Sequence, residues 1–194
     1  DNFELINEDV LKVNLAEIIK KEKENNNFLN AKIVANLPYY ITTPIIMKLL
    51  EEELDIKSIT VMIQKEVAER LIAVPGDKFS GAITYCVYYY ADSEKIMGVD
   101  NNSFIPEPEV QSEVIKLNIR SAPALELKDK DLFFKVVKVS FMQRRKTLMN
   151  SLVNGGVLKS KDEARKMFEE LGFDVNVRGE NLSMGDFERI CEWL

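Results

Sequence analysis

The stretch Asn36-Leu37-Pro38-Tyr39 combines residue types suited to holding a flat, nitrogen-bearing substrate. The Asn36 amide can both donate and accept hydrogen bonds, Pro38 stiffens the backbone, and Tyr39 offers an aromatic face for stacking. These properties predict a binding loop for a planar ring. An ordinary strand-to-helix turn would explain the same four residues.

The segments on either side of this loop are expected to position it. Residues 32–35 form a short apolar run that predicts a buried strand, and residues 44–53 predict a helix with Thr43 as cap and Pro44 in the first turn. The loop therefore follows the carboxyl end of a strand, which is where ligands bind in open α/β sheets.

The remaining pattern up to residue 121 alternates strands and helices, which is typical of an α/β sheet. Strands are expected at 3–6, 58–63, 95–99 and 113–119, the last two as an antiparallel pair, and helices from Asn14, at 64–71 and at 81–90. After Pro123 only helices follow: 131–141, one capped by Ser160 and one beginning at Ser183. We therefore predict two domains, residues 1–121 and 122–194.

The amino-acid composition excludes several kinds of catalytic and metal site. The 194 residues include no histidine, which excludes histidine-based acid–base or nucleophilic catalysis and any Cys/His zinc site. Cys86 and Cys191 lie in apolar helical patterns and are expected to be reduced core residues, which fits a cytoplasmic protein. No metal site is predicted.

Charge is distributed unevenly around a net value of −6. Residues 1–121 carry a net −7 and residues 122–194 a net +1. The second part contains a run of basic residues without an intervening acid: Lys135, Lys138, Arg144, Arg145 and Lys146. Such a patch can bind nucleic-acid phosphates, with Arg144, Arg145 and Lys146 as the candidates, although a solvated helix face is an equally good explanation.

Five segments occur in the order found in one family, and with them the chain resembles the KsgA-type small-subunit rRNA adenine dimethyltransferases. The segments are Asn36–Pro44, Met62–Leu71, Phe104–Val110, Gln143–Leu148 and Arg178–Ser183. The resemblance implies a partial Rossmann-like class I methyltransferase sheet domain followed by a small all-helical domain that docks on rRNA. It also implies dimethylation of adjacent adenosines at N6 near the 3′ end of small-subunit rRNA, with S-adenosylmethionine as methyl donor.

Two departures from the family pattern stand out. The glycine-rich turn and the acidic residue that hold the cofactor are absent, and both would lie upstream of Asp1. We therefore expect a truncated form that binds cofactor weakly and is inactive, with an exposed sheet edge that favours association in solution. Glu109 and Gln111 also replace the usual basic and acidic residues of the Phe104 loop.

The resemblance assigns roles to individual residues. Asn36, Leu37, Pro38 and Tyr39 form the catalytic loop, with the Asn36 side chain and the Leu37 or Pro38 carbonyl accepting hydrogen bonds from the adenine amine. Tyr39 and Phe104 stack on the target base, unless Phe104 simply plugs the core. Asp9 and Asn36 contact the cofactor, although Asp9 could equally be a turn residue, and Arg178 with Glu180 could form an internal ion pair.

Two alternatives remain open. One is the related large-subunit rRNA methyltransferase of the antibiotic-resistance type, and the other is a non-catalytic RNA-binding factor of ribosome assembly. The expected partners are small-subunit rRNA and the immature small subunit, with no membrane, and the full-length enzyme is expected to be a monomer.

Overall fold

The computed structural model describes residues 3–26, 30–143 and 145–194, which form two compact units. The sheet unit contains the chain up to Ala68 together with Glu94–Ile119, and the helical unit contains Glu69–Ser93 together with Arg120–Leu194. The sequence placed residues 69–93 in the first domain. They group with the helices because Tyr85 and Tyr89 are part of the aromatic core of the helical unit.

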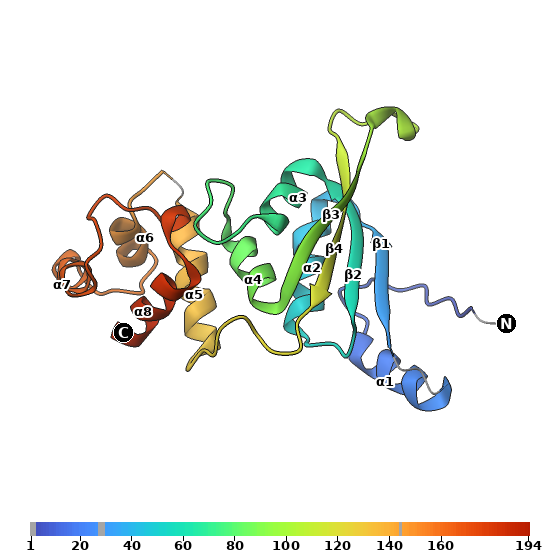
Figure 1. Cartoon of the computed structure of the whole chain (residues 1–194), viewed down its shortest axis with the longest axis horizontal. Helices are drawn as coiled ribbons and strands as arrows, with labels where there is room; N and C mark the ends of the chain where they lie inside the picture. Colours follow the sequence, from blue (N-terminus) through green and yellow to red (C-terminus); the bar gives the residue numbers. More distant parts are fainter. Residues whose placement is uncertain (1–2, 27–29, 144) are drawn as a thin grey trace. The chain divides into compact units, whose positions relative to one another are not determined.

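The sheet has four strands in the order β1-β2-β4-β3, where β1 is Lys32–Asn36, β2 Ser58–Gln64, β3 Ala91–Val99 and β4 Ser112–Ile119 (Figure 1). β1 is parallel to β2, and β4 is antiparallel to β2. Asn36 pairs in register with Met62, and Gln64 pairs with Ser112. The end of β1 and the start of β4 therefore flank the same end of β2.

Three helices lie close to the predicted positions: α1 (Leu15–Asn26), α2 (Thr42–Glu51) and α3 (Lys65–Ile72), the last of which starts in the sheet unit and ends in the helical unit. Two short helices of the sheet unit, η1 (Tyr39–Ile41) and η2 (Asn101–Ser103), were not predicted. One face of β2 and β4 is buried, with Ile59, Val61, Ile63, Ile115 and Leu117, and on α2 the apolar side chains Ile46 and Leu50 are buried too. β1 is the outermost strand on its side of the sheet, and its Val34 side chain is 78% exposed.

The strand predicted at residues 3–6 is wrong. This segment has no regular structure, and Phe3 and Leu5 are 78% and 76% exposed. An alternating pattern specifies which side chains share a face, but a strand forms only when its backbone amides and carbonyls find a partner.

The helical unit consists of α4 (Ala82–Tyr90), α5 (Lys130–Met142), α6 (Leu148–Asn154), α7 (Lys161–Leu171), the short η3 (Gly179–Asn181) and α8 (Met184–Trp193). Side-chain caps begin four of these helices, at Asp129, Thr147, Ser160 and Ser183. The predicted caps Ser160 and Ser183 and the helix expected at 81–90 are confirmed. α6 was not predicted.

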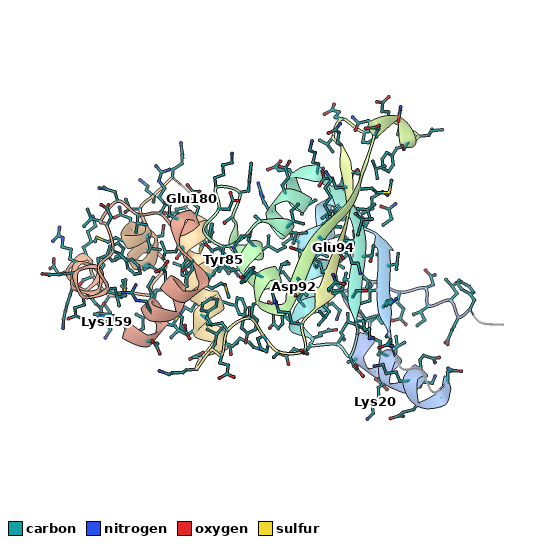
Figure 2. The ribbon with its side chains drawn as sticks, viewed as in Figure 1. Lys20, Tyr85, Asp92, Glu94, Lys159 and Glu180 are labelled. Carbon is teal, nitrogen blue, oxygen red and sulfur yellow. The ribbon has the colours of Figure 1, made fainter. Side chains whose placement is uncertain are left out.

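Aromatic side chains fill the core of the helical unit. Tyr85, which is labelled in Figure 2, is at most 1% exposed, as are Phe133, Phe168 and Phe187. The Tyr85 and Phe187 rings meet edge to face, with 5.1 Å between their centroids. The Tyr85 hydroxyl donates to the Leu182 carbonyl at 2.5 Å. Burial raises the pKa of Tyr85 to about 12. In the described part of the chain, none of the helices has the length and apolar character needed to cross a membrane.

Candidate active site

An open pocket of about 260 Å³ lies at the carboxyl end of β1, entirely within the sheet unit. Its lining consists of Asn36, Leu37, Pro38 and Tyr39 on one side and Phe104, Pro106 and Pro108 on the other. The structure thus brings Tyr39 and Phe104 to one pocket, although 64 residues of chain separate them. Cavities that hold whole drug-sized ligands measure about 300–1,000 Å³, so this one suits a single ring system.

The first half of the loop is fixed by β2. The Leu37 amide donates to the Met62 carbonyl at 3.2 Å, and the Leu37 side chain is only 6% exposed. The Asn36 and Pro38 side chains on either side remain exposed. Leu37 therefore anchors the loop in the core, while the Asn36 amide remains accessible to a ligand.

The second half of the loop is fixed by the start of α2. The Pro38 carbonyl accepts from the Thr42 hydroxyl at 3.0 Å and from the Ile41 amide at 3.2 Å. The prediction of Thr43 as helix cap is therefore wrong: the helix begins two residues earlier, at Thr42 with Ile41 in the cap position, and the buried Thr42 holds the loop. Because the Pro38 carbonyl already has two donors, Leu37 offers the better carbonyl for a ligand amine.

Tyr39 is held by a residue that the sequence did not single out. Its hydroxyl lies 2.6 Å from the Ser112 hydroxyl, and Ser112, at the first position of β4, is 1% exposed. The two residues are 73 positions apart, so no local pattern could have connected them.

Asp9 lies in a turn before α1. Its Oδ1 accepts from the Leu11 amide at 3.0 Å, and the side chain is exposed. It does not line the pocket. Its assignment to the cofactor stays a prediction.

The basic candidates belong to the helical unit. Arg144 lies outside the described residues, and Arg145 and Lys146 are exposed between α5 and α6. Lys135 and Lys138 are exposed on α5. Arg178 and Glu180 do form the expected ion pair, with 3.9 Å between Nη1 and Oε1.

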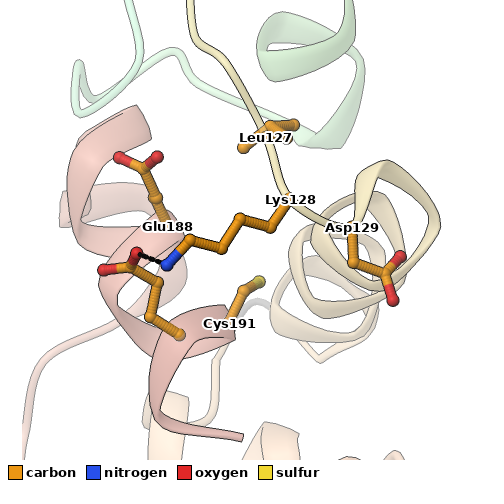
Figure 3. Close-up of a pocket in the computed structure, with 6 residues that line it drawn as sticks. Leu127, Lys128, Asp129, Glu188 and Cys191 are labelled. Atoms are coloured by element: carbon orange, nitrogen blue, oxygen red, sulfur yellow. Dashed lines mark hydrogen bonds and ion pairs between the residues drawn. The ribbon is translucent and has the colours of Figure 1, made fainter.

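A second cavity, in the helical unit, is too small to hold a ring system. It measures about 50 Å³ and includes Cys191, beside the ion pair of Lys128 and Glu192 (Figure 3). Burial raises the pKa of the Cys191 thiol to about 12, so this thiol is protonated and unreactive at neutral pH. Across the described residues, no group of three or more cysteine or acidic side chains is placed to hold a metal ion.

Comparison with known proteins extends these observations. A family model described as ribosomal RNA adenine dimethylase matches residues 1–194. The ribosomal RNA small subunit methyltransferase A of Clostridioides difficile is 49% identical over 187 residues, which are 96% of this chain and 63% of that protein. The protein of the same name from Clostridium botulinum is 47% identical over 194 residues, 100% of this chain and 68% of that protein. The chain thus spans roughly two thirds of the length of these relatives.

Solved structures show the same fold. A dimethyladenosine transferase from Plasmodium falciparum superposes with a TM-score of 0.67 at 24% identity, over 92% of this chain and 78% of that one. The 23S rRNA methyltransferase ErmE gives a TM-score of 0.58 at 18% identity, over 94% of this chain and 78% of that one. At these identities the likeness concerns the fold alone. With its whole length matched by the family model, and with relatives nearly half identical, the chain belongs to the ribosomal RNA adenine dimethylase family.

Proposed function

We propose that this protein dimethylates adjacent adenosines at N6 near the 3′ end of small-subunit rRNA. The observation that carries the proposal is the pocket in which the Asn36 amide and the Leu37 backbone lie beside two aromatic residues, Tyr39 and Phe104. This combination suits a flipped purine with an exocyclic amine.

The loop activates the amine by accepting hydrogen bonds from it, and the proton leaves to solvent after methyl transfer. The lone pair of an adenine amine is delocalised into the ring, which makes the nitrogen a poor nucleophile. Hydrogen bonds from its two N–H groups to the Asn36 Oδ1 and the Leu37 carbonyl favour a pyramidal nitrogen with an available lone pair. The Pro38 carbonyl, already used by Thr42 and Ile41, instead keeps the loop in place.

The aromatic residues hold the base once it has left its stack. Tyr39 and Phe104 line the pocket from two different loops, and each stacking contact is worth about 1–3 kcal/mol. The prolines Pro106 and Pro108 restrict the loop that carries Phe104. Tight placement of the nitrogen lowers the barrier without a strong base, which agrees with a chain that has no histidine.

The residues of this chain fit S-adenosylmethionine only in part. Asn36 at the end of β1 and the exposed carboxylate of Asp9 offer acceptors for its polar groups, while the glycine-rich turn of the family is not among the 194 residues. The cofactor would supply an activated methyl group on sulfur. We therefore propose that the 194-residue chain by itself binds the cofactor weakly.

Exposed cations of the helical unit are proposed to dock the protein on rRNA phosphates. Arg145 and Lys146 lie exposed in the turn after α5, and Arg144 is assigned by its place in the same motif. Their contribution to affinity should fall with rising salt. Action on the small subunit would place the protein in the cytoplasm, where we propose that it works as a monomer.

The test is transfer of labelled methyl from S-adenosylmethionine to undermethylated small subunits, run with this chain and with the longest form that its gene encodes. In the active form, Asn36→Ala should lower the rate about a hundredfold or more, in the range seen when an oriented polar group is removed from an active site. Asn118→Ala is the matched control, because Asn118 is a strand residue at the far end of β4 and bonds to Glu94.

Near-normal transfer by Asn36→Ala would contradict the proposal. Absence of transfer by every form, combined with retained binding to the small subunit, would favour a non-catalytic assembly factor instead.

A further inference from the structure

We infer that Ser112 is a positioning residue for the methyl-transfer reaction, acting through the Tyr39 ring. This inference rests on the proposed function and adds a residue to it. Its basis is the 2.6 Å contact between the hydroxyls of Ser112 and Tyr39, which joins the loop after β1 to the start of β4.

Ser112 is itself held firmly. It pairs in register with Gln64 at the end of β2, and its side chain is 1% exposed. The preceding residue, Gln111, accepts from the Lys65 amide at 2.9 Å through its carbonyl and from the Lys65 Nζ at 3.1 Å through its side chain. The Ser112 hydroxyl is therefore a fixed point in the sheet unit.

Tyr39 needs such a fixed point because the rest of its loop does not hold the ring. The bond to Met62 fixes the Leu37 amide, and the bond from Thr42 fixes the Pro38 carbonyl. Neither bond involves the Tyr39 ring. Rotation about the Cα–Cβ and Cβ–Cγ bonds would move the Tyr39 ring out of the pocket wall. A hydrogen bond at the far end of the ring restricts both rotations. It also gives the Tyr39 hydroxyl a partner in the protein, which leaves the face of the ring for stacking.

The geometry gives a specific expectation for kinetics. RNA docking depends on the helical unit, so loss of the Ser112 hydroxyl should leave the KM for the small subunit unchanged. The target base should be held less precisely, because the Tyr39 ring is less restricted. We therefore expect kcat to fall about three- to tenfold, the factor that corresponds to one neutral hydrogen bond. Tyr39→Phe, which keeps the ring and removes the hydroxyl, should have the same effect.

Four variants of the active form test this: Ser112→Ala, Ser112→Thr, Tyr39→Phe and the double variant Ser112→Ala with Tyr39→Phe. Ser112→Thr keeps a hydroxyl and should restore kcat, and the double variant should be no slower than either single one. Ser58→Ala is the matched control, because Ser58 is also the buried first residue of a strand but lies at the other end of β2. A second readout is NMR of tyrosine-labelled protein, in which Ser112→Ala should shift the Tyr39 ring signals and Ser58→Ala should not.

Wild-type kcat in Ser112→Ala, unchanged Tyr39 signals, or additive losses in the double variant would overturn the role of Ser112. A loss in Ser112→Ala that Ser112→Thr does not restore would also overturn it. Absence of transfer by the wild type would instead contradict the proposed function, and the role of Ser112 with it.

Discussion

Both units bury an apolar core, but of the fifteen large apolar side chains that are exposed among the described residues, ten lie in the sheet unit and five in the helical unit. In the helical unit, Phe133, Phe168 and Phe187 are at most 1% exposed. In the sheet unit, Phe3 and Val34 are both 78% exposed, and β1 has no described strand on its outer side. The residues proposed to carry out the chemistry belong to the less enclosed unit.

This contrast indicates a division between stability and function. The closed aromatic core gives the helical unit most of its stability from apolar burial. The sheet unit has a buried core as well, and at its pocket backbone and hydroxyl hydrogen bonds hold Leu37, Pro38 and Tyr39. Substitutions of the same kind should therefore have different effects in the core of the helical unit and at the exposed positions of the sheet unit.

The largest difference is expected for truncation of an apolar side chain. Phe187→Ala should lower the free energy of unfolding of the helical unit by about 3–5 kcal/mol, because it leaves a cavity beside Tyr85 and Phe133. Val34→Ala should change stability by no more than about 0.5 kcal/mol, because the side chain is already solvated. Urea unfolding can be followed by the fluorescence of Trp193, which is the single tryptophan and lies in the helical unit. A small effect of Phe187→Ala would show that this core is not tightly packed.

A smaller difference is expected for added methyl groups. A Cβ at Gly179 would lie 2.9 Å from the Cβ and 3.0 Å from the carbonyl oxygen of Ser140, so Gly179→Ala should destabilise the helical unit by about 1–3 kcal/mol. A Cβ at Gly98, in β3, would meet nothing within 4 Å. Gly98→Ala should therefore be neutral or stabilising by up to about 1 kcal/mol. Thermal unfolding of both variants measures this, and equal losses would contradict the contrast.

The smallest effect concerns pH. Burial raises the pKa of Tyr85 from 10.0 to about 12, so the unfolded chain loses this proton first as the pH rises. The ionisation of Tyr85 leaves the free energy of unfolding unchanged below about pH 10 and lowers it by about 1.4 kcal/mol per pH unit between about pH 10 and 12. Tyr85→Phe lacks this ionisation. Its stability should fall less steeply above pH 10 than that of the wild type, while at neutral pH it should lose about 1 kcal/mol with the hydrogen bond to Leu182.

Denaturant titrations at pH 8, 10 and 11 compare the two proteins directly. All other ionisable groups are common to the two proteins, so their contributions cancel in the difference. Parallel stability curves across this range would place Tyr85 in a solvated environment.

The sequence predicted those parts of the site that short segments specify by themselves. Asn36 to Tyr39 follow a strand as expected, and Phe104 shares their pocket. Thr42 was overlooked because Thr43, next to a proline, has the more typical pattern of a helix start. Ser112 could not be found, because nothing in its own segment shows that a tyrosine hydroxyl from another part of the chain meets it.

Dependence on residues far away in the sequence also explains why the strand predicted at residues 3–6 is wrong. Helix caps such as Ser160 and Ser183 act on their own next turn, so the sequence determines them locally. A strand depends on a neighbour that can be anywhere in the chain. The local alternation at Phe3 and Leu5 therefore predicted a strand that the described chain does not pair.

The position of β4 between β2 and β3 has a consequence for biosynthesis. β2 leaves the ribosome more than fifty residues before β4, so its inner edge has no neighbour until residues 112–119 have emerged. Tyr39 is made 73 residues before Ser112, whose hydroxyl meets it from β4. The loop therefore gains this support only after residues 112–119 have been translated, and a nascent chain that is released before then would carry the loop without it.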